Sequence, residues 1–104
     1  MNRRFYNIIG SSKPVLVDFY TDWCIPCKQM QPVLKSIKDD LKNNIRIIKV
    51  NVDNNPLIAF RYHINAVPTL MIFQGGKQLW SGSGLRSPDE IKRLLTTHIN
   101  REAN

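Results

Sequence analysis

The residues best suited to chemistry are Cys24 and Cys27, the only two cysteines in the 104-residue chain. Ile25 and Pro26 separate them, and this Cys-X-X-Cys spacing brings two sulfur atoms within bonding reach at the start of a helix. Thiol–disulfide exchange needs such a pair, because one thiolate attacks a disulfide and a second thiol then resolves the mixed disulfide. The pair therefore predicts a thiol–disulfide oxidoreductase.

The segments around the cysteines predict a buried strand followed by a helix. Residues 14–20 are apolar without alternation, apart from Asp18, and this pattern is typical of a strand covered on both faces. After the cysteines, apolar residues recur with helical spacing as far as about residue 41. Pro26 falls in the first turn, where proline does no harm, whereas Pro32 is expected to kink the helix.

Each of the three polar groups in this region has an expected role. At the helix start, Cys24 faces unpaired N–H groups and the positive end of the helix dipole, so we expect its pKa to fall from about 8.5 towards about 7. Cys27, one turn inside and less exposed, suits the resolving role. Asp18 is expected to be buried with a raised pKa and to accept the proton of Cys27, directly or through water. A purely structural, hydrogen-bonded role for Asp18 is the alternative.

Two other uses of a Cys-X-X-Cys pair fit the sequence less well. A zinc site needs four ligands, usually with a second close pair of Cys or His. Only His63 and His98 remain, and they are far apart in the chain. A structural disulfide would close a four-residue loop and constrain little of the chain. We therefore expect no metal site.

Length and composition predict a single domain over residues 1–104, with enough hydrophobic residues, 42%, to form a core. No stretch approaches 18 consecutive apolar residues, and the N-terminus lacks the apolar segment of a signal peptide. Two cysteines in such a chain fit a reducing compartment, so we expect a cytoplasmic protein, with a precursor that has lost its signal as the alternative.

The formal net charge is +7, which could favour nucleic acid, an anionic membrane or acidic partners. The lysines and arginines are scattered, with no basic run of five or more. We expect a solvated basic surface and no dedicated nucleic-acid-binding face.

The rest of the chain predicts elements in the order α-β-α-β-α-β-β-α. A strand over residues 45–52 completes a right-handed βαβ unit with parallel strands. Gly75 and Gly76 predict a tight hairpin, and Gly82 and Gly84 are expected to break the chain after it. The remaining predictions are a short helix over residues 3–9, a helix capped by Asn55 that carries Leu57, Phe60 and Ile64, and a last helix opened by a capping box at Ser87.

Taken together, the motifs resemble the thioredoxin family over about residues 14–100. The resemblance is carried by Val17-Asp18-Phe19-Tyr20, Trp23-Cys24-Ile25-Pro26-Cys27-Lys28, Pro32, Val67-Pro68-Thr69 and Gly84. It implies an α/β protein with the thioredoxin fold, in which helices flank a mixed central sheet.

The resemblance also implies roles for particular residues. Cys24 would be the attacking nucleophile and Cys27 the resolving cysteine, while Asp18 would be the buried acid that serves Cys27, with Lys49 as its cationic partner. Pro68 matches a cis-proline that faces the cysteines. The apolar docking surface would be framed by Trp23, Ile25, Pro26, Val67 and Gly84, with Val67 pairing its backbone with a bound substrate strand.

The function implied is that of a general protein disulfide reductase, monomeric and without a bound cofactor. Its partners would be disulfide-containing proteins and a thioredoxin reductase, a flavoprotein that supplies reducing equivalents from NADPH, with no nucleic acid or membrane involved. Two alternatives remain: an extracytoplasmic or more oxidising thioredoxin-like oxidoreductase, and a redox-silent adaptor with the thioredoxin fold.

The sequence departs from the family in three ways. Ile25 replaces the usual glycine, the chain is basic where the family tends to be acidic, and the first strand of the family is missing before Phe5. We therefore expect four main strands, with strand 45–52 at an edge, where Arg46, Lys49 and Asn51 would discourage edge pairing.

Overall fold

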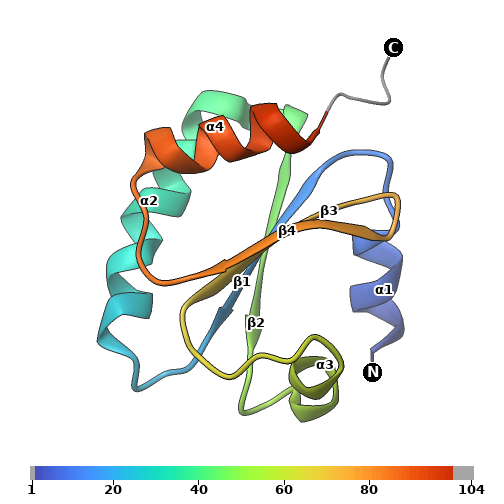
Figure 1. Cartoon of the computed structure of the whole chain (residues 1–104), viewed down its shortest axis with the longest axis vertical. Helices are drawn as coiled ribbons and strands as arrows, with labels where there is room; N and C mark the ends of the chain where they lie inside the picture. Colours follow the sequence, from blue (N-terminus) through green and yellow to red (C-terminus); the bar gives the residue numbers. More distant parts are fainter. Residues whose placement is uncertain (1, 100–104) are drawn as a thin grey trace.

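The computed structural model describes residues 2–99 and contains a four-stranded mixed sheet flanked by helices. The strand order is β2-β1-β3-β4; β2 runs parallel to β1, whereas β3 and β4 continue the sheet antiparallel. Helices α1 and α3 cover one face and α2 and α4 the other (Figure 1). The predicted element order and the edge position of β2 are confirmed. The elements are α1 (Arg3–Ile9), β1 (Val15–Tyr20), α2 (Ile25–Leu41), the 3-10 turn η1 (Lys42–Asn44), β2 (Arg46–Asn51), α3 (Pro56–Arg61), β3 (Thr69–Gln74), β4 (Lys77–Ser83) and α4 (Pro88–His98).

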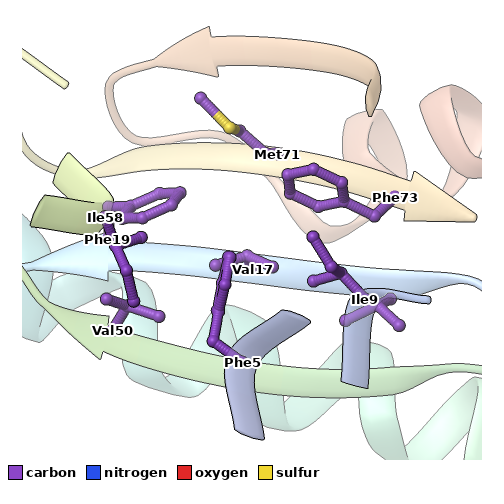
Figure 2. Packing of buried hydrophobic residues seen from close by; sticks show 9 residues of the cluster. Phe5, Ile9, Val17, Phe19, Val50, Ile58, Met71 and Phe73 are labelled. Carbon is purple, nitrogen blue, oxygen red and sulfur yellow. The ribbon is translucent and has the colours of Figure 1, made fainter. Parts of the chain in front are cut away.

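Strand β1 lies between β2 and β3, and its side chains alternate between two hydrophobic cores. Val17 and Phe19 point into the core beneath α1 and α3, where Figure 2 shows them in one cluster with Phe5 and Phe73. Leu16 points into the other core, beneath α2 and α4. Because both faces are covered, the strand shows no polar alternation, as its sequence predicted.

The caps at two helix starts differ in detail from their predictions. Ser87 Oγ accepts a hydrogen bond from the Glu90 N–H at 3.2 Å, as a capping box requires. The Glu90 carboxylate, however, pairs with Arg86 at 2.6 Å. Asn55 occupies the N-cap position of α3, but its side chain does not cap the helix and instead donates to the Asn51 carbonyl at 2.9 Å. The prediction of an Asn55 cap is therefore wrong.

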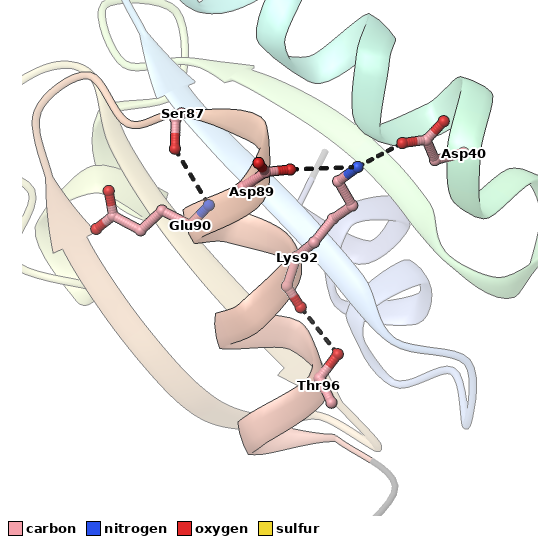
Figure 3. A network of polar contacts seen from close by, with 6 residues as sticks. All are labelled: Asp40, Ser87, Asp89, Glu90, Lys92 and Thr96. Atoms are coloured by element: carbon pink, nitrogen blue, oxygen red, sulfur yellow. Dashed lines mark hydrogen bonds and ion pairs between the residues drawn. The ribbon is translucent and has the colours of Figure 1, made fainter.

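A polar network joins α4 to α2, the two helices that cover the core around Leu16. The Lys92 ammonium lies between the carboxylates of Asp40 on α2 and Asp89 on its own helix, at 3.8 Å from the latter (Figure 3). Such pairs near the surface contribute little to stability, because water screens the charges. The apolar contacts of Ile91 and Leu95 with the core therefore hold α4 in place more than the ion pairs do.

Helix α3 presents a different face to the core from the one expected. Ile58 and Ala59 are buried, whereas Leu57 and Phe60 are 71% and 81% exposed, and Ile64 lies beyond the end of the helix. A helix of six residues has fewer than two turns, so apolar spacing alone does not determine its orientation.

The hairpin between β3 and β4 follows its prediction, but the end of β4 does not. Gly75 and Gly76 have φ values of +61° and +80°, as a two-residue turn with positive φ at both positions requires. The strand then continues through Gly82 instead of breaking there. A Cβ atom on Gly82 would lie 2.5 Å from the Trp80 ring and 2.7 Å from the Arg86 guanidinium. This glycine therefore makes room for packing, and the chain turns at Gly84, whose φ is +94°.

A substitution at Phe73 tests the packing of the core beneath α1 and α3. The fully buried ring of Phe73 packs edge-on against Tyr62 at 5.4 Å and Phe5 at 6.3 Å. Replacing it with alanine removes these contacts and leaves a cavity. We expect Phe73→Ala to lower the free energy of unfolding by about 3–5 kcal/mol in urea titrations. The exposed Lys77→Ala serves as control, and a loss below about 1 kcal/mol at Phe73 would contradict this account of the core.

Candidate active site

The two cysteines lie where the central strand gives way to α2. Cys24 is the N-cap of α2, with extended backbone angles, and its Sγ accepts a hydrogen bond from the Cys27 N–H at 3.1 Å. A disulfide joins the pair, with Cα atoms 5.2 Å apart. One of the unsatisfied N–H groups of the helix terminus is therefore directed at the first sulfur.

Access to the cysteines is limited in this disulfide-bonded form. Cys24 is 4% exposed and Cys27 2% exposed, so both residues are buried and Cys27 is only marginally the less exposed of the two. Cys24 lines a groove of about 660 Å³. An attacking or incoming sulfur would approach through this groove.

The walls of this groove are largely apolar and come from three segments of the chain, residues 21–26, 52–53 and 64–67. Trp23 and Ile25, which are 71% and 68% exposed, line the groove together with Pro26 and Val67. The other lining residues are Thr21, Val52, Asp53, Ile64, Asn65 and Ala66. Exposed apolar side chains next to a reactive pair suit the docking of an apolar polypeptide segment.

Pro68 and Gly84, the other two predicted docking residues, do not line the groove. The Val67–Pro68 peptide bond is cis, as the resemblance implied, and Pro68 itself is buried. The Gly84 N–H donates to the Pro68 carbonyl at 2.9 Å. Gly84 therefore contacts the proline segment from outside the groove.

Polar contacts from the end of β2 hold the turn that carries Cys24. Trp23 Nε1 donates to the Asp53 carboxylate at 3.3 Å, and the Asn51 amide donates to Asp22 at 3.3 Å. Asn51 and Asp53 were not singled out as site residues from the sequence. Their position at the carboxyl end of a strand parallel to β1 was the available signal, because such ends meet at one edge of a sheet.

Asp18 is the buried acid of the site. The residue is fully buried, and loss of hydration raises its pKa from 3.8 to about 6; the Gln31 hydrogen bond and the Lys49 charge oppose this rise. Its Oδ1 atom has no hydrogen-bond partner within residues 2–99. Both the burial and the raised pKa match the sequence prediction.

Gln31 connects Asp18 to Cys27 and to Lys49. Its side-chain amide lies 3.4 Å from Asp18 Oδ2 and donates to the Cys27 carbonyl at 3.2 Å, while its oxygen accepts from Lys49 Nζ at 2.7 Å. Lys49 lies opposite Asp18 in the β1–β2 register, but it reaches the carboxylate through this amide. Sequence reasoning missed Gln31, although it lies one turn beyond Cys27 on α2.

Within residues 2–99, no group of three or more His, Cys, Asp and Glu side chains is placed to hold a metal ion. None of the helices in this range is long and apolar enough to span a bilayer.

A redox-capable cysteine pair at a helix N-terminus, next to a buried acid and an apolar groove, defines a thiol–disulfide oxidoreductase. The family model Thioredoxin matches residues 1–97. The chain belongs to the thioredoxin family, whose members reduce protein disulfides with the cysteine pair itself and need no bound cofactor.

Individual relatives agree with this assignment. Thioredoxin from Pyropia yezoensis is 43% identical over 93 residues, which cover 89% of this chain and 87% of that protein. A bifunctional thioredoxin reductase/thioredoxin from Mycobacterium leprae is 42% identical over 88% of this chain and 20% of its own length. Among solved structures, a mutant thioredoxin from Halobacterium salinarum superposes with a TM-score of 0.82 at 32% identity, covering 90% of this chain and 81% of that one.

The buried Asp18 makes a prediction about stability and pH. Because its folded pKa of about 6 lies above the unfolded value of 3.8, the folded state binds more protons between these values. The contribution of the protonated Asp18 carboxyl group to the free energy of unfolding is therefore full below about pH 4, and it is lost as the pH rises through about 6. The free energy of unfolding of Asp18→Asn should therefore rise relative to that of wild type as the pH increases. From about pH 4 to about pH 7 this difference should grow by roughly 2–3 kcal/mol in favour of the variant.

Urea titrations at a series of pH values measure this difference. The exposed Asp39→Asn is the matched control on the protein surface and should show little change with pH. A difference between Asp18→Asn and wild type that stays constant with pH would contradict a raised pKa for Asp18.

Proposed function

We propose that this chain is a general protein disulfide reductase in which Cys24 attacks and Cys27 resolves. The observation that carries this assignment of roles is the hydrogen bond from the Cys27 N–H to Cys24 Sγ at the N-terminus of α2. A backbone donor and the positive end of a helix stabilise a thiolate at the first position. Cys27 lies inside the helix and has no equivalent donor aimed at its sulfur in residues 2–99.

In the first step, the Cys24 thiolate attacks one sulfur of a substrate disulfide lying in the groove. A mixed disulfide forms between Cys24 and the substrate, and the other substrate sulfur leaves as a thiolate that takes up a proton. Trp23 and Ile25 hold the surrounding substrate segment by apolar contact, and Val67 pairs with it through its backbone.

In the second step, Cys27 must lose its proton and attack Cys24 Sγ. This attack re-forms the Cys24–Cys27 disulfide and releases the second substrate thiolate, so two electrons pass from the pair to the substrate. Asp18, with its pKa of about 6, accepts the Cys27 proton at neutral pH, directly or through water. Gln31 orients the carboxylate relative to Cys27, and Lys49 orients Gln31.

The disulfide then needs a reductant, for which we propose an NADPH-dependent thioredoxin reductase. The name of the Mycobacterium leprae relative, which joins a thioredoxin reductase to a thioredoxin, supports this choice of partner. We also propose that the chain acts as a monomer in the cytoplasm. A reducing compartment suits this protein because its two cysteines must be returned to the reduced state.

The roles of the two cysteines predict different defects. Cys24→Ser should abolish the reduction of insulin disulfides, because no thiolate remains to attack. Cys27→Ser should also stop turnover, but it should accumulate a mixed disulfide that mass spectrometry detects on Cys24. Full activity of Cys24→Ser, or trapping on Cys27 of the Cys24→Ser variant, would overturn the assignment.

The source of electrons is tested in the same assay by replacing dithiothreitol with NADPH and a thioredoxin reductase. We expect NADPH consumption coupled to insulin reduction, and a reduction potential near the roughly −270 mV of a reducing thioredoxin. A potential near the roughly −120 mV of a strong oxidant would instead favour the oxidising alternative.

Gln31 has its own prediction, because removing its amide takes a hydrogen bond from Asp18. In Gln31→Met the pKa of Asp18 should rise above about 6, and the pH profile for resolution of the mixed disulfide should move to higher pH. The exposed Gln29→Met on the same helix is the control and should leave the profile in place. A purely structural role would alter stability without moving the profile.

A further inference from the structure

Strand β2 leaves one edge of the sheet unpaired in the part of the chain that the structure describes. The Arg46 and Val52 N–H groups donate towards β1, each at 2.9 Å. In a parallel pair, alternate residues direct both backbone groups to the same side, so those of Ile47 and Lys49 face away from β1.

Asn51, the next residue in this alternation, also directs its backbone carbonyl away from β1. The Asn51 carbonyl accepts from the Asn55 side chain, and not from β1. The open part of the edge is therefore centred on Ile47 and Lys49, with two donors and two acceptors that a further strand could use.

A groove follows this edge on the face covered by α1. It consists of two cavities of about 610 and 310 Å³ that share Arg4, Ile8 and Arg46 among their lining residues. Ile8 and Ile48 are half-buried and supply apolar surface, so a side chain from an added strand would find apolar contact there.

The rim of the groove carries strong positive charge. Arg3, Arg4 and Arg46 are exposed, and none of them forms an ion pair within residues 2–99. No acidic side chain among the described residues lines either cavity. Three uncompensated guanidinium groups around an open strand edge favour a ligand that carries carboxylates.

We propose that this edge is a docking site for an extended acidic segment of a partner protein, which adds a strand alongside β2. The segment's backbone would pair with Ile47 and Lys49, its apolar side chains would enter the groove, and its carboxylates would contact the three arginines. This site goes beyond the disulfide reductase activity. In the parallel register Arg46 lies opposite Val15, at the start of β1, whereas Cys24 follows the end of that strand.

Two other occupants fit the observations less well. A second copy of the chain would bring the same arginines together at a β2–β2 contact, and like charges across paired strands are destabilising. A nucleic acid would offer phosphates to the arginines, but it has no strand backbone to use the alternating donors and acceptors of Ile47 and Lys49.

Synthetic peptides test the proposal against the full chain. The probe is a blocked peptide of about eight residues in which Glu alternates with Val, and its counterparts carry Lys in place of Glu or N-methyl groups on alternate amides. We expect the Glu peptide to bind in calorimetric titrations and to shift the backbone amide NMR signals of Ile47 and Lys49. The Lys peptide and the N-methylated Glu peptide should not bind, the latter because its charge is intact but its pairing is blocked.

Charge-reversal variants locate the site. The double variant Arg4→Glu/Arg46→Glu should weaken binding of the Glu peptide by at least about tenfold. Lys77→Glu/Arg93→Glu makes the same change of charge at exposed positions elsewhere and should weaken binding by less than about twofold. Circular dichroism and insulin reduction, expected to be unchanged in both variants, show that each protein is folded.

Three results would overturn the proposal. Equal binding of the N-methylated peptide would exclude an added strand, and equal losses in the two double variants would reduce the effect to general charge. Binding of a DNA duplex that depends on Arg4 and Arg46, without binding of the Glu peptide, would instead assign the surface to nucleic acid.

Discussion

The site depends on one contact, the hydrogen bond from the Cys27 N–H to the sulfur of Cys24. It exists because a buried strand stops at Tyr20 and α2 starts at Ile25, with Cys24 as its N-cap, so that the unsatisfied end of the helix meets the first cysteine. The rest of the architecture fixes this junction. Strand β1 is held on both sides by neighbouring strands, and Asn51 and Asp53 tie the intervening turn to the end of β2.

The second constraint is the fully buried carboxylate of Asp18, which has no direct cationic contact within residues 2–99. A lysine pressed against Asp18 would favour the charged form and hold its pKa low. Here Lys49 contacts the neutral amide of Gln31, so the charge of Lys49 and the Gln31 hydrogen bond only partly offset the effect of burial, and the pKa rises to about 6. A carboxyl group in this range can both take and return a proton near neutral pH, which is the property that a resolving cysteine needs.

Local rules predicted much of the fold and the centre of the site. The continuous apolar run ending at Tyr20, the helix start at Cys24 and the hairpin at Gly75 and Gly76 all follow from residue type and spacing, and the structure agrees. The burial of Asp18 could also be predicted, because the residue lies inside an apolar strand.

What could not be predicted depends on contacts between elements that are distant in the chain. Gln31 becomes a site residue only because α2 packs over β1 and β2 in one particular orientation. Leu57 and Phe60 are exposed because Ile58 anchors a helix too short to follow its own periodicity. Asn55 was a sound N-cap by residue type, but the Asn51 carbonyl at the open edge of the sheet competed for its side chain.

The packing at the end of β4 has a consequence for how this sequence can diverge. The Arg86 guanidinium lies 5.1 Å from the centre of the Trp80 ring, and both groups occupy the space that a side chain at position 82 would need. A larger residue at position 82 is compatible with the fold only once the indole and the guanidinium have been displaced or replaced. These three positions should therefore covary among homologous chains, with glycine retained wherever the tryptophan and arginine persist together.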